Sequence, residues 1–287
     1  MELIQFLLLR TVAIIAFKGP RVFSDGSGVP FRLGDRYFLL TAGHVVSVLQ
    51  LDNPEVEVRL HVTDKEHKFV LRWLRAGQGG HEDVADYGYI ELHPECARSM
   101  EAFSKVFLSP KSFFMGQLKH DRCCLGGYPS SERSEHSNGS LSPRLCGVMA
   151  HPVTSSAPST LPLPSQQVSY VDLYFPEDEM RKYDPTQEGS VEGEVPPLRG
   201  ASGGGWWCSE REGGEPWRVP NLKLFGTHMG SGSDPGRYLR CVLISEHIKL
   251  LLEDYPDLAP VWAVSQLNTG ASVDSQPPQN NPVKDIS

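Results

Sequence analysis

Three short segments contain residue types that together could carry out nucleophilic chemistry. "YFLLTAGHVVSV", residues 37–48, presents His44 after two small residues, and "DYGYIEL", residues 86–92, begins with Asp86. "GASGGGWW", residues 200–207, places Ser202 among glycines. A serine hydroxyl is a weak nucleophile until a base accepts its proton and hydrogen-bond donors stabilise the oxyanion that follows. The segments therefore predict a base, a carboxylate that orients it, and a nucleophile.

Each segment also has a plainer interpretation. A lone histidine beside an apolar run is more often a structural residue with its hydrogen bonds satisfied. A glycine-rich turn can contain a serine by chance, although here the N–H groups of Gly200 and Ser202 could form an oxyanion hole. Asp83 competes with Asp86 for the role of the carboxylate. Asp86 is preferred because it leads directly into an apolar strand, whereas Asp83 beside Glu82 is typical of a solvated turn.

Short strands separated by turns must position these side chains. Alternation of apolar and polar residues with a period of two predicts half-buried antiparallel strands and an all-β class. Helices and strands do not alternate regularly along the sequence, so a parallel α/β sheet is disfavoured. The expected strands are residues 11–17, 37–42, 56–62, 68–74, 86–92, 122–128, 145–150, 168–175, 222–229 and 238–245.

A short helix or turn is expected before residue 11, and one clear helix at 245–255, with Ser245 as its cap and Pro256 ending it. Residues 152–166 and 176–197 are predicted to be long surface loops. The polar composition beyond Val264 is typical of a disordered tail.

The three motifs resemble those of the chymotrypsin-like (trypsin-fold) serine peptidases. "LLTAGHVV" resembles the histidine motif of that family, "DYGYIEL" its aspartate strand and "GASGGG" its nucleophile loop, in the same chain order. The resemblance spans residues 11–250. It implies two six-stranded antiparallel barrels with a C-terminal helix, and a catalytic triad in the cleft between the barrels.

The resemblance also implies a division of the chain. Residues 1–110 would form the barrel half with His44 and Asp86, and residues 111–245 the half with the nucleophile. Residues 246–264 would form the C-terminal helix and extension, and 265–287 the tail. The implied activity is that of a serine endopeptidase working through an acyl-enzyme intermediate.

Departures from the family point to a particular branch. Ala201 stands where secreted members carry an acidic residue that pairs with a freshly cut N-terminus, so activation by that route is not expected. Leu198 replaces a family cysteine, and no cysteine adjoins His44. The pattern is most similar to bacterial, non-secreted trypsin-like peptidases, which implies a regulated intracellular protease of a stress or defence pathway.

Two other functions stay open at this stage. A catalytically silent protease-fold module for binding or signalling would keep the same residues around a misformed oxyanion hole. An esterase of the α/β-hydrolase fold would place its nucleophile between a parallel strand and a helix, and the sequence "SEREGGEP" predicts a turn there instead.

The segment "LFGTHMGSGSD", residues 224–234, is expected to line the pocket for the residue before the scissile bond. "GTHMGS" resembles the G-x-H-x-G segment of glutamate-specific members, which makes Thr227, His228, Gly230 and Ser231 candidate substrate-binding residues. The alternative is that His228 is buried and structural. Pro196 lies six positions before Ser202, where an acidic residue would favour Arg or Lys, so that preference has little support.

Composition and charge exclude several other functions. A net charge of -8 and the absence of a basic run argue against nucleic-acid binding. Glu2 and Arg10 interrupt what would otherwise resemble a signal peptide or membrane span, so we expect a cytoplasmic protein with no membrane association. We expect a protein or peptide substrate. Activity would have to be restrained by narrow specificity, by an activating or inhibiting protein partner, or by a loop within 152–197.

The six cysteines are expected to be reduced in the cytosol. Zinc binding by Cys123 and Cys124 with His120, His136 or His151 is disfavoured, because adjacent cysteines lack the two-residue gap that lets both thiolates face one metal. We therefore expect neither a metal ion nor another cofactor.

Overall fold

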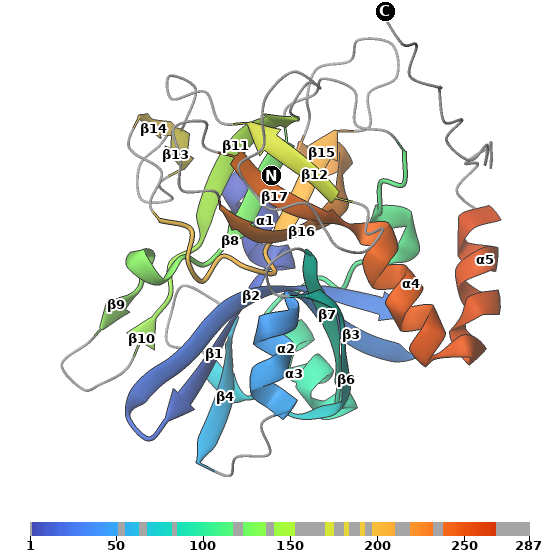
Figure 1. The fold of residues 1–287 in the computed structure, drawn as a ribbon, viewed down its shortest axis with the longest axis horizontal. Coiled ribbons are helices and arrows are strands. Elements are labelled where there is room, and N and C mark those ends of the chain that lie inside the picture. Colours follow the sequence, from blue (N-terminus) through green and yellow to red (C-terminus); the bar gives the residue numbers. More distant parts are fainter. Residues whose placement is uncertain are drawn as a thin grey trace, which may run out of the picture.

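The structure is a computed structural model of the 287-residue chain. It describes residues 2–50, 55–62, 68–81, 85–116, 123–135, 141–152, 170–174, 181–183, 190–192, 197–209, 219–231 and 238–267. These residues form mostly antiparallel strands with a few helices, so the all-β class is confirmed. The N-terminal strands lie below the C-terminal barrel in Figure 1.

The N-terminal strands form one antiparallel sheet in the order β5-β4-β1-β2-β3-β7-β6. Their bounds are β1 Val12–Lys18, β2 Arg21–Leu33, β3 Arg36–Thr41, β4 Val56–His61, β5 Lys68–Val70, β6 Trp73–His81 and β7 Ala85–Leu92. The sheet has seven strands, in place of the six expected.

The strand patterns in the sequence predicted five strands in this half, and two differences account for the seven observed. The segment expected as one strand at 68–74 divides into β5 and β6. Strand β2 was missed because Gly26, Gly28 and Pro30 interrupt its apolar pattern. Its length allows it to pair with β1 in its first part and with β3 in its second.

Strand β1 shows how the sheet is buried on both faces. Ala13, Ile15 and Phe17 belong to one hydrophobic core, which also contains residues of the C-terminal half. Val12, Ile14 and Ala16 alternate with them and belong to a second core under α2 and α3. The period of two is therefore as predicted, but this strand is buried on both sides instead of half-buried.

The C-terminal strands close into a barrel in the order β11-β12-β17-β16-β15-β8. Their bounds are β8 Cys123–Gly127, β11 Cys146–Pro152, β12 Tyr170–Tyr174, β15 Gly205–Ser209, β16 Leu222–Ser231 and β17 Tyr238–Leu243. Strand β15, which follows the glycine-rich loop, was not predicted. Trp206 and Trp207 are fully buried, and this strand anchors the loop before it between β8 and β16.

The described helices are α1 Leu3–Arg10, α2 Gly43–Gln50, α3 Pro94–Ala102, α4 Ile244–Asp254 and α5 Ala259–Leu267. Helix α4 matches the predicted helix, but Leu243 occupies its N-cap position and Ser245 lies inside it. Helices α2, α3 and α5 were missed. Helix α5 extends past residue 264, where the tail was expected to begin, and residues 268–287 lie outside the described ranges.

Shorter elements complete the described chain. They are η1 Pro110–Ser112, η2 Ser130–Glu132, η3 Val219–Asn221, η4 Pro256–Leu258, and the strand pairs β9 Ser134–Glu135 with β10 Leu141–Ser142 and β13 Arg181–Tyr183 with β14 Ser190–Glu192. The pair β13–β14 falls within the predicted loop 176–197. Residues 153–169, which contain most of the other predicted loop, lie outside the described residues.

Both ends of the described chain connect the two halves. In α1, Phe6 packs edge-on against Trp207 of the barrel, with ring centroids 5.0 Å apart. At the end of α4, the Tyr255 hydroxyl donates a 2.7 Å hydrogen bond to Glu91 of β7. The second contact holds β7, which carries Asp86, against the C-terminal half.

Candidate active site

His44 and Asp86 are held together by two contacts. The backbone N–H of His44 donates to Oδ1 of Asp86 at 2.8 Å, and Nδ1 of the ring lies against Oδ2 of the same carboxylate. Because a carboxylate accepts, Nδ1 carries the hydrogen and the lone pair stays on Nε2. The imidazole is therefore oriented as a base, and its side chain is 36% exposed while that of Asp86 is only 6% exposed.

The local fold explains the first contact. Strand β3 ends at Thr41 and α2 begins at Gly43, so the N–H of His44 lies in the first turn of the helix, where no intrahelical acceptor is available. Gly43 is required by close approach, since a Cβ built there would lie 2.3 Å from Oδ1 of Asp86. Helix α2, which was not predicted, therefore places the backbone N–H of His44 against the carboxylate of Asp86.

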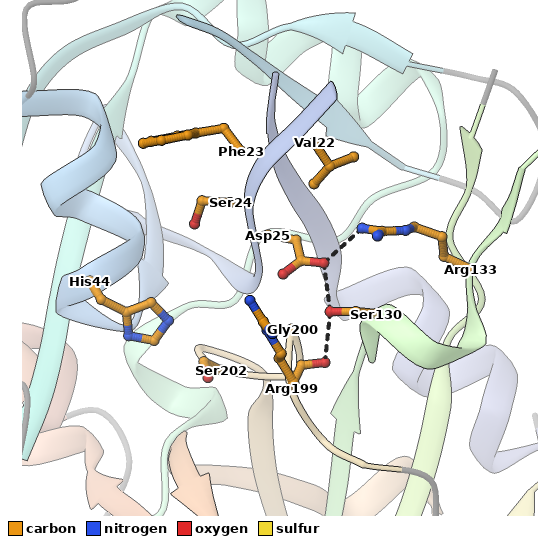
Figure 2. Close-up of a pocket in the computed structure, with 10 residues that line it drawn as sticks. All are labelled: Val22, Phe23, Ser24, Asp25, His44, Ser130, Arg133, Arg199, Gly200 and Ser202. Atoms are coloured by element: carbon orange, nitrogen blue, oxygen red, sulfur yellow. Dashed lines mark hydrogen bonds and ion pairs between the residues drawn. The ribbon is translucent and has the colours of Figure 1, made fainter. Parts of the chain in front are cut away.

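Ser202 lies in the loop that directly precedes β15. Its hydroxyl donates a weak hydrogen bond to the carbonyl of Met229 on β16, at 3.4 Å. Ser202 and His44 line the same pocket and lie close to each other in Figure 2. Rotation of the hydroxyl away from Met229 would bring it toward the histidine.

The backbone of the loop that contains Ser202 leaves two amide groups without an acceptor in the described parts of the chain. Gly200 has φ +86°, a left-handed conformation that L side chains rarely adopt. Ala201 N–H donates to the carbonyl of Leu198, and Gly203 N–H to that of His228. Among the described residues, the N–H groups of Gly200 and Ser202 donate to no acceptor. Those two amides are the donors predicted from the sequence.

Nothing in the sequence indicated a role for Ser27 of β2. All its polar groups form hydrogen bonds with the loop of Ser202 or with residues next to that loop. Its N–H donates to the carbonyl of Ser202 at 2.7 Å, and its hydroxyl to the carbonyl of Gly200 at 3.0 Å. The same hydroxyl accepts from the N–H of Tyr128, and its carbonyl accepts from Thr41 at 2.6 Å. No residue-type signal marks a serine in "DGSG" for this role.

His247 of α4 is a second missed residue, placed behind the aspartate strand. Its Nδ1 lies 3.1 Å from the carbonyl of Gly88 and its Nε2 lies 2.7 Å from Oγ1 of Thr227. The carbonyl can only accept, so Nδ1–H donates and Nε2 accepts from the threonine hydroxyl. Complete burial lowers the pKa of His247 to about 4, so the ring is neutral at pH 7.

The predicted substrate-binding residues lie on β16, next to Ser202. Thr227 is fully buried and directed at His247, which is a structural contact. His228 is 1% exposed, and its Nδ1 has no hydrogen-bond partner within the described residues. Burial, and secondarily the nearby His44, lower the pKa of His228 to about 3. Gly230 and Ser231 end the strand, and their side-chain positions lie outside the described residues.

Several predicted features fall outside the described parts of the chain. Asp83, the competitor of Asp86, is one of them, as are His120 and His136 and the turn "SEREGGEP" after Ser209. All six cysteines are buried free thiols. Within the described ranges, no three side chains of His, Cys, Asp or Glu gather as metal ligands.

A pocket of about 380 Å³ is lined by His44 and Ser202 and by residues of β2. Strand β2, the turn at η2 and the loop before Ser202 form its walls (Figure 2). Asp25 lies inside it and accepts hydrogen bonds from Ser130 at 2.6 Å and from Arg133 at 2.9 Å. Arg199, directly before Gly200, is exposed and lines the same space.

Comparisons with known proteins give the following similarities. No protein-family model and no curated protein match the sequence. Among solved structures, the inactive form of the Rv3671c protease of M. tuberculosis is similar with a TM-score of 0.46 and 14% identity, over 88% of this chain and 91% of that one. An inactive serine-to-alanine mutant of Rv3671c from strain H37Rv has a TM-score of 0.47 and 14% identity, over 88% and 89%.

A thermostable serine protease, AL20, from an extremophilic microorganism is similar with a TM-score of 0.45 and 11% identity, over 82% of this chain and 91% of that chain. These structural neighbours are serine proteases, but similarity this low assigns no function. In the described residues, no helix is long and apolar enough to cross a membrane.

Proposed function

We propose that the protein is a serine endopeptidase that hydrolyses peptide bonds with His44, Asp86 and Ser202. The observation that carries the proposal is the double contact of Asp86 with His44, which leaves Nε2 as a base beside a serine. The unoccupied amides of Gly200 and Ser202 support it, because they can stabilise negative charge on a carbonyl oxygen.

The chemistry would proceed in two halves. Oγ of Ser202 attacks the scissile carbonyl carbon while its proton passes to Nε2 of His44, and the oxyanion accepts hydrogen bonds from the two amides. Collapse breaks the C–N bond, and His44 protonates the departing amine. A water molecule, deprotonated by His44, then attacks the acyl-ester, releases the carboxylic acid and restores Ser202. Asp86 stabilises the imidazolium in both halves.

The acidic preference expected before the scissile bond is part of the proposal. His228 lies on β16 beside Met229, whose carbonyl contacts Ser202, and its unpartnered Nδ1 would be a donor for a substrate carboxylate. His228→Ala should lower kcat/KM for cleavage after Glu more than for cleavage after Leu. Equal losses for the two substrates would assign His228 a structural role.

A catalytically silent binding or signalling module is the second candidate. The observation in its favour is that the Ser202 hydroxyl donates to the carbonyl of Met229. Catalytic hydrogen bonds are often long or misaligned in free enzymes, which favours the peptidase. The resemblance noted from the sequence extends the proposal to a regulated cytoplasmic protease of a stress or defence pathway.

Covalent labelling distinguishes the two candidates. Purified protein is incubated with a fluorophosphonate and its intact mass is measured beside Ser202→Ala and His44→Ala. The peptidase should gain one adduct, at Ser202, and both variants should gain none. Ser99→Ala, which changes an exposed serine of α3, is the matched control and should label like the wild type. Absence of an adduct on the wild-type protein would favour the silent module.

A further inference from the structure

The pocket beside Ser202 and strand β16 reach the serine through different sets of residues. Its walls come from β2, η2 with Arg133, and the residues from Arg199 to Ser202, and no β16 residue lines it. Met229 of β16 instead contacts the serine hydroxyl through its carbonyl. The two sets of residues therefore offer separate surfaces to a bound peptide.

The position of His44 indicates which part of a substrate enters the pocket. In the proposed reaction His44 gives its proton to the departing amine, so the leaving group must lie on the side of the histidine. His44 itself lines the pocket (Figure 2). The peptide segment that follows the scissile bond would thus lie along β2, over this space.

The described residues that line the pocket carry an excess of one positive charge. The carboxylate of Asp25 is compensated by the guanidinium of Arg133, and their side chains are 16% and 22% exposed. Ser130 completes the cluster by donating to the same carboxylate oxygen. Arg199 is also a cation lining the pocket; the Ser130 hydroxyl donates to its backbone carbonyl, and no described residue forms an ion pair or hydrogen bond with its guanidinium. One positive charge therefore remains available to a ligand.

The pocket also has an apolar wall. Phe23 of β2 is 50% exposed, which is unusual for a large aromatic side chain in a strand, and it lines the pocket with Val22. A bound segment could pack its aliphatic carbons on this ring and direct an anionic group at Arg199. The combination suits a carboxylate on a short aliphatic stem.

We propose that this pocket is a subsite for a carboxylate on the leaving-group side of the substrate, with Arg199 as its cation. The proposal rests on the proposed peptidase function and adds a specificity on the other side of the scissile bond from His228. The carboxylate has two sources, the side chain of Glu or Asp and the free C-terminus of a short leaving peptide. Both would present the same group to the same guanidinium.

The test uses one cleaved peptide, selected from a proteome-derived library, and varies the two positions after its scissile bond. Glu, Gln and Lys are compared in C-terminally amidated peptides, and a free-acid Gln peptide ending at the second position supplies the other source. Wild-type kcat/KM should favour a carboxylate over its neutral counterpart by roughly fivefold at low salt, with a smaller ratio at high salt. Arg199→Gln should bring the ratio to about one, and Arg199→Glu should favour Lys.

Matched variants and controls make the outcomes decisive. Arg98→Gln removes an exposed arginine on α3, away from the pocket, and should keep the wild-type ratio. An effect confined to the Glu peptide identifies a side-chain carboxylate, and one confined to the free acid identifies a C-terminus. An identical ratio in the wild type and Arg199→Gln would overturn the subsite while leaving the peptidase intact. Absence of the fluorophosphonate adduct on the wild type would instead overturn the peptidase, and the subsite with it.

Discussion

The histidine–aspartate pair and the nucleophile loop reach the same pocket through different kinds of contact. His44 and Asp86 belong to the N-terminal half, and one carboxylate holds both the ring and the backbone of the histidine. Ser202 belongs to the C-terminal half, and the hydrogen bonds that hold its loop involve mainly backbone groups. Two of these come from Ser27, which lies in the other half.

The His44–Asp86 pair and the loop of Ser202 therefore depend on different parts of the fold. His44 lies in the first turn of α2, directly after β3, and Asp86 lies near the start of β7, the neighbour of β3 in the same sheet, so elements of the N-terminal half alone bring the two side chains together. The loop of Ser202 obtains its shape only where β2 meets the barrel. The histidine side should therefore be sensitive to one side-chain charge, and the serine side to contacts between the halves.

The largest expected effect tests the histidine side. Asp86→Asn should lower the rate of fluorophosphonate labelling and of peptide hydrolysis by roughly three to four orders of magnitude, because an amide can present its N–H to Nδ1 and favour the wrong tautomer. Labelling kinetics against wild type provide the measurement. Asp35→Asn, in an exposed turn, is the matched control. Full activity of Asp86→Asn together with an inactive Asp83→Asn would transfer the role to Asp83.

A smaller effect is expected on the serine side. Ser27→Ala should slow labelling by about tenfold to a hundredfold, because the carbonyl of Gly200 loses its donor and the oxyanion loop relaxes. The buried N–H of Tyr128 also loses its acceptor, so the free energy of unfolding should fall by about 1–3 kcal/mol. Chemical denaturation and labelling kinetics are measured on the same preparation. An unchanged labelling rate in a destabilised protein would make Ser27 purely structural.

The smallest effect concerns the contact between the halves at His247. Its pKa is about 4 in the folded protein and about 6.5 in an unfolded chain. The unfolded chain therefore binds the extra proton first, so the stability that the neutral ring supports is complete above pH 6.5 and is lost as the pH falls toward 4. His228, with a folded pKa of about 3, should contribute in the same direction.

His247→Asn isolates this contribution, because an amide can still donate to the carbonyl of Gly88. The unfolding free energy, measured by urea denaturation between pH 7 and pH 4, should fall less steeply with acidification than in the wild type. The slope should correspond to the uptake of up to about one proton fewer on unfolding. Ser99→Ala, which changes an exposed residue of α3 and removes no titratable group, should leave the slope equal to that of the wild type. An equal slope in His247→Asn and the wild type would contradict the linkage.

Much of the fold could be predicted because strand signals are local. Alternating apolar residues marked β1, β3, β4 and β7, and glycine and proline marked many of the turns. The missed elements carry conflicting local signals. Strand β2 contains glycines and a proline, and α2 is a short helix rich in valine, a residue typical of strands. Their pairing and burial in the folded chain outweigh these preferences.

Residue chemistry, together with the resemblance of three motifs in the same chain order to those of a known family, made His44, Asp86 and Ser202 recognisable as candidates. Nothing local could identify Ser27, whose partner Gly200 is 173 positions away. The same holds for the pairing of Asp25 with Arg133, 108 positions apart. Such contacts depend on how the two halves dock.

The all-β class and the three candidate catalytic residues could thus be predicted from local preferences and side-chain chemistry, which are properties of short segments. Tertiary structure alone decided the direction of His44, the support of the oxyanion loop by Ser27 and the cationic pocket around Arg199. The reason is physical: a hydrogen bond or an uncompensated charge is defined by distances between groups, and for residues far apart in the chain those distances exist only once the elements within a half, or the two halves themselves, have packed against each other.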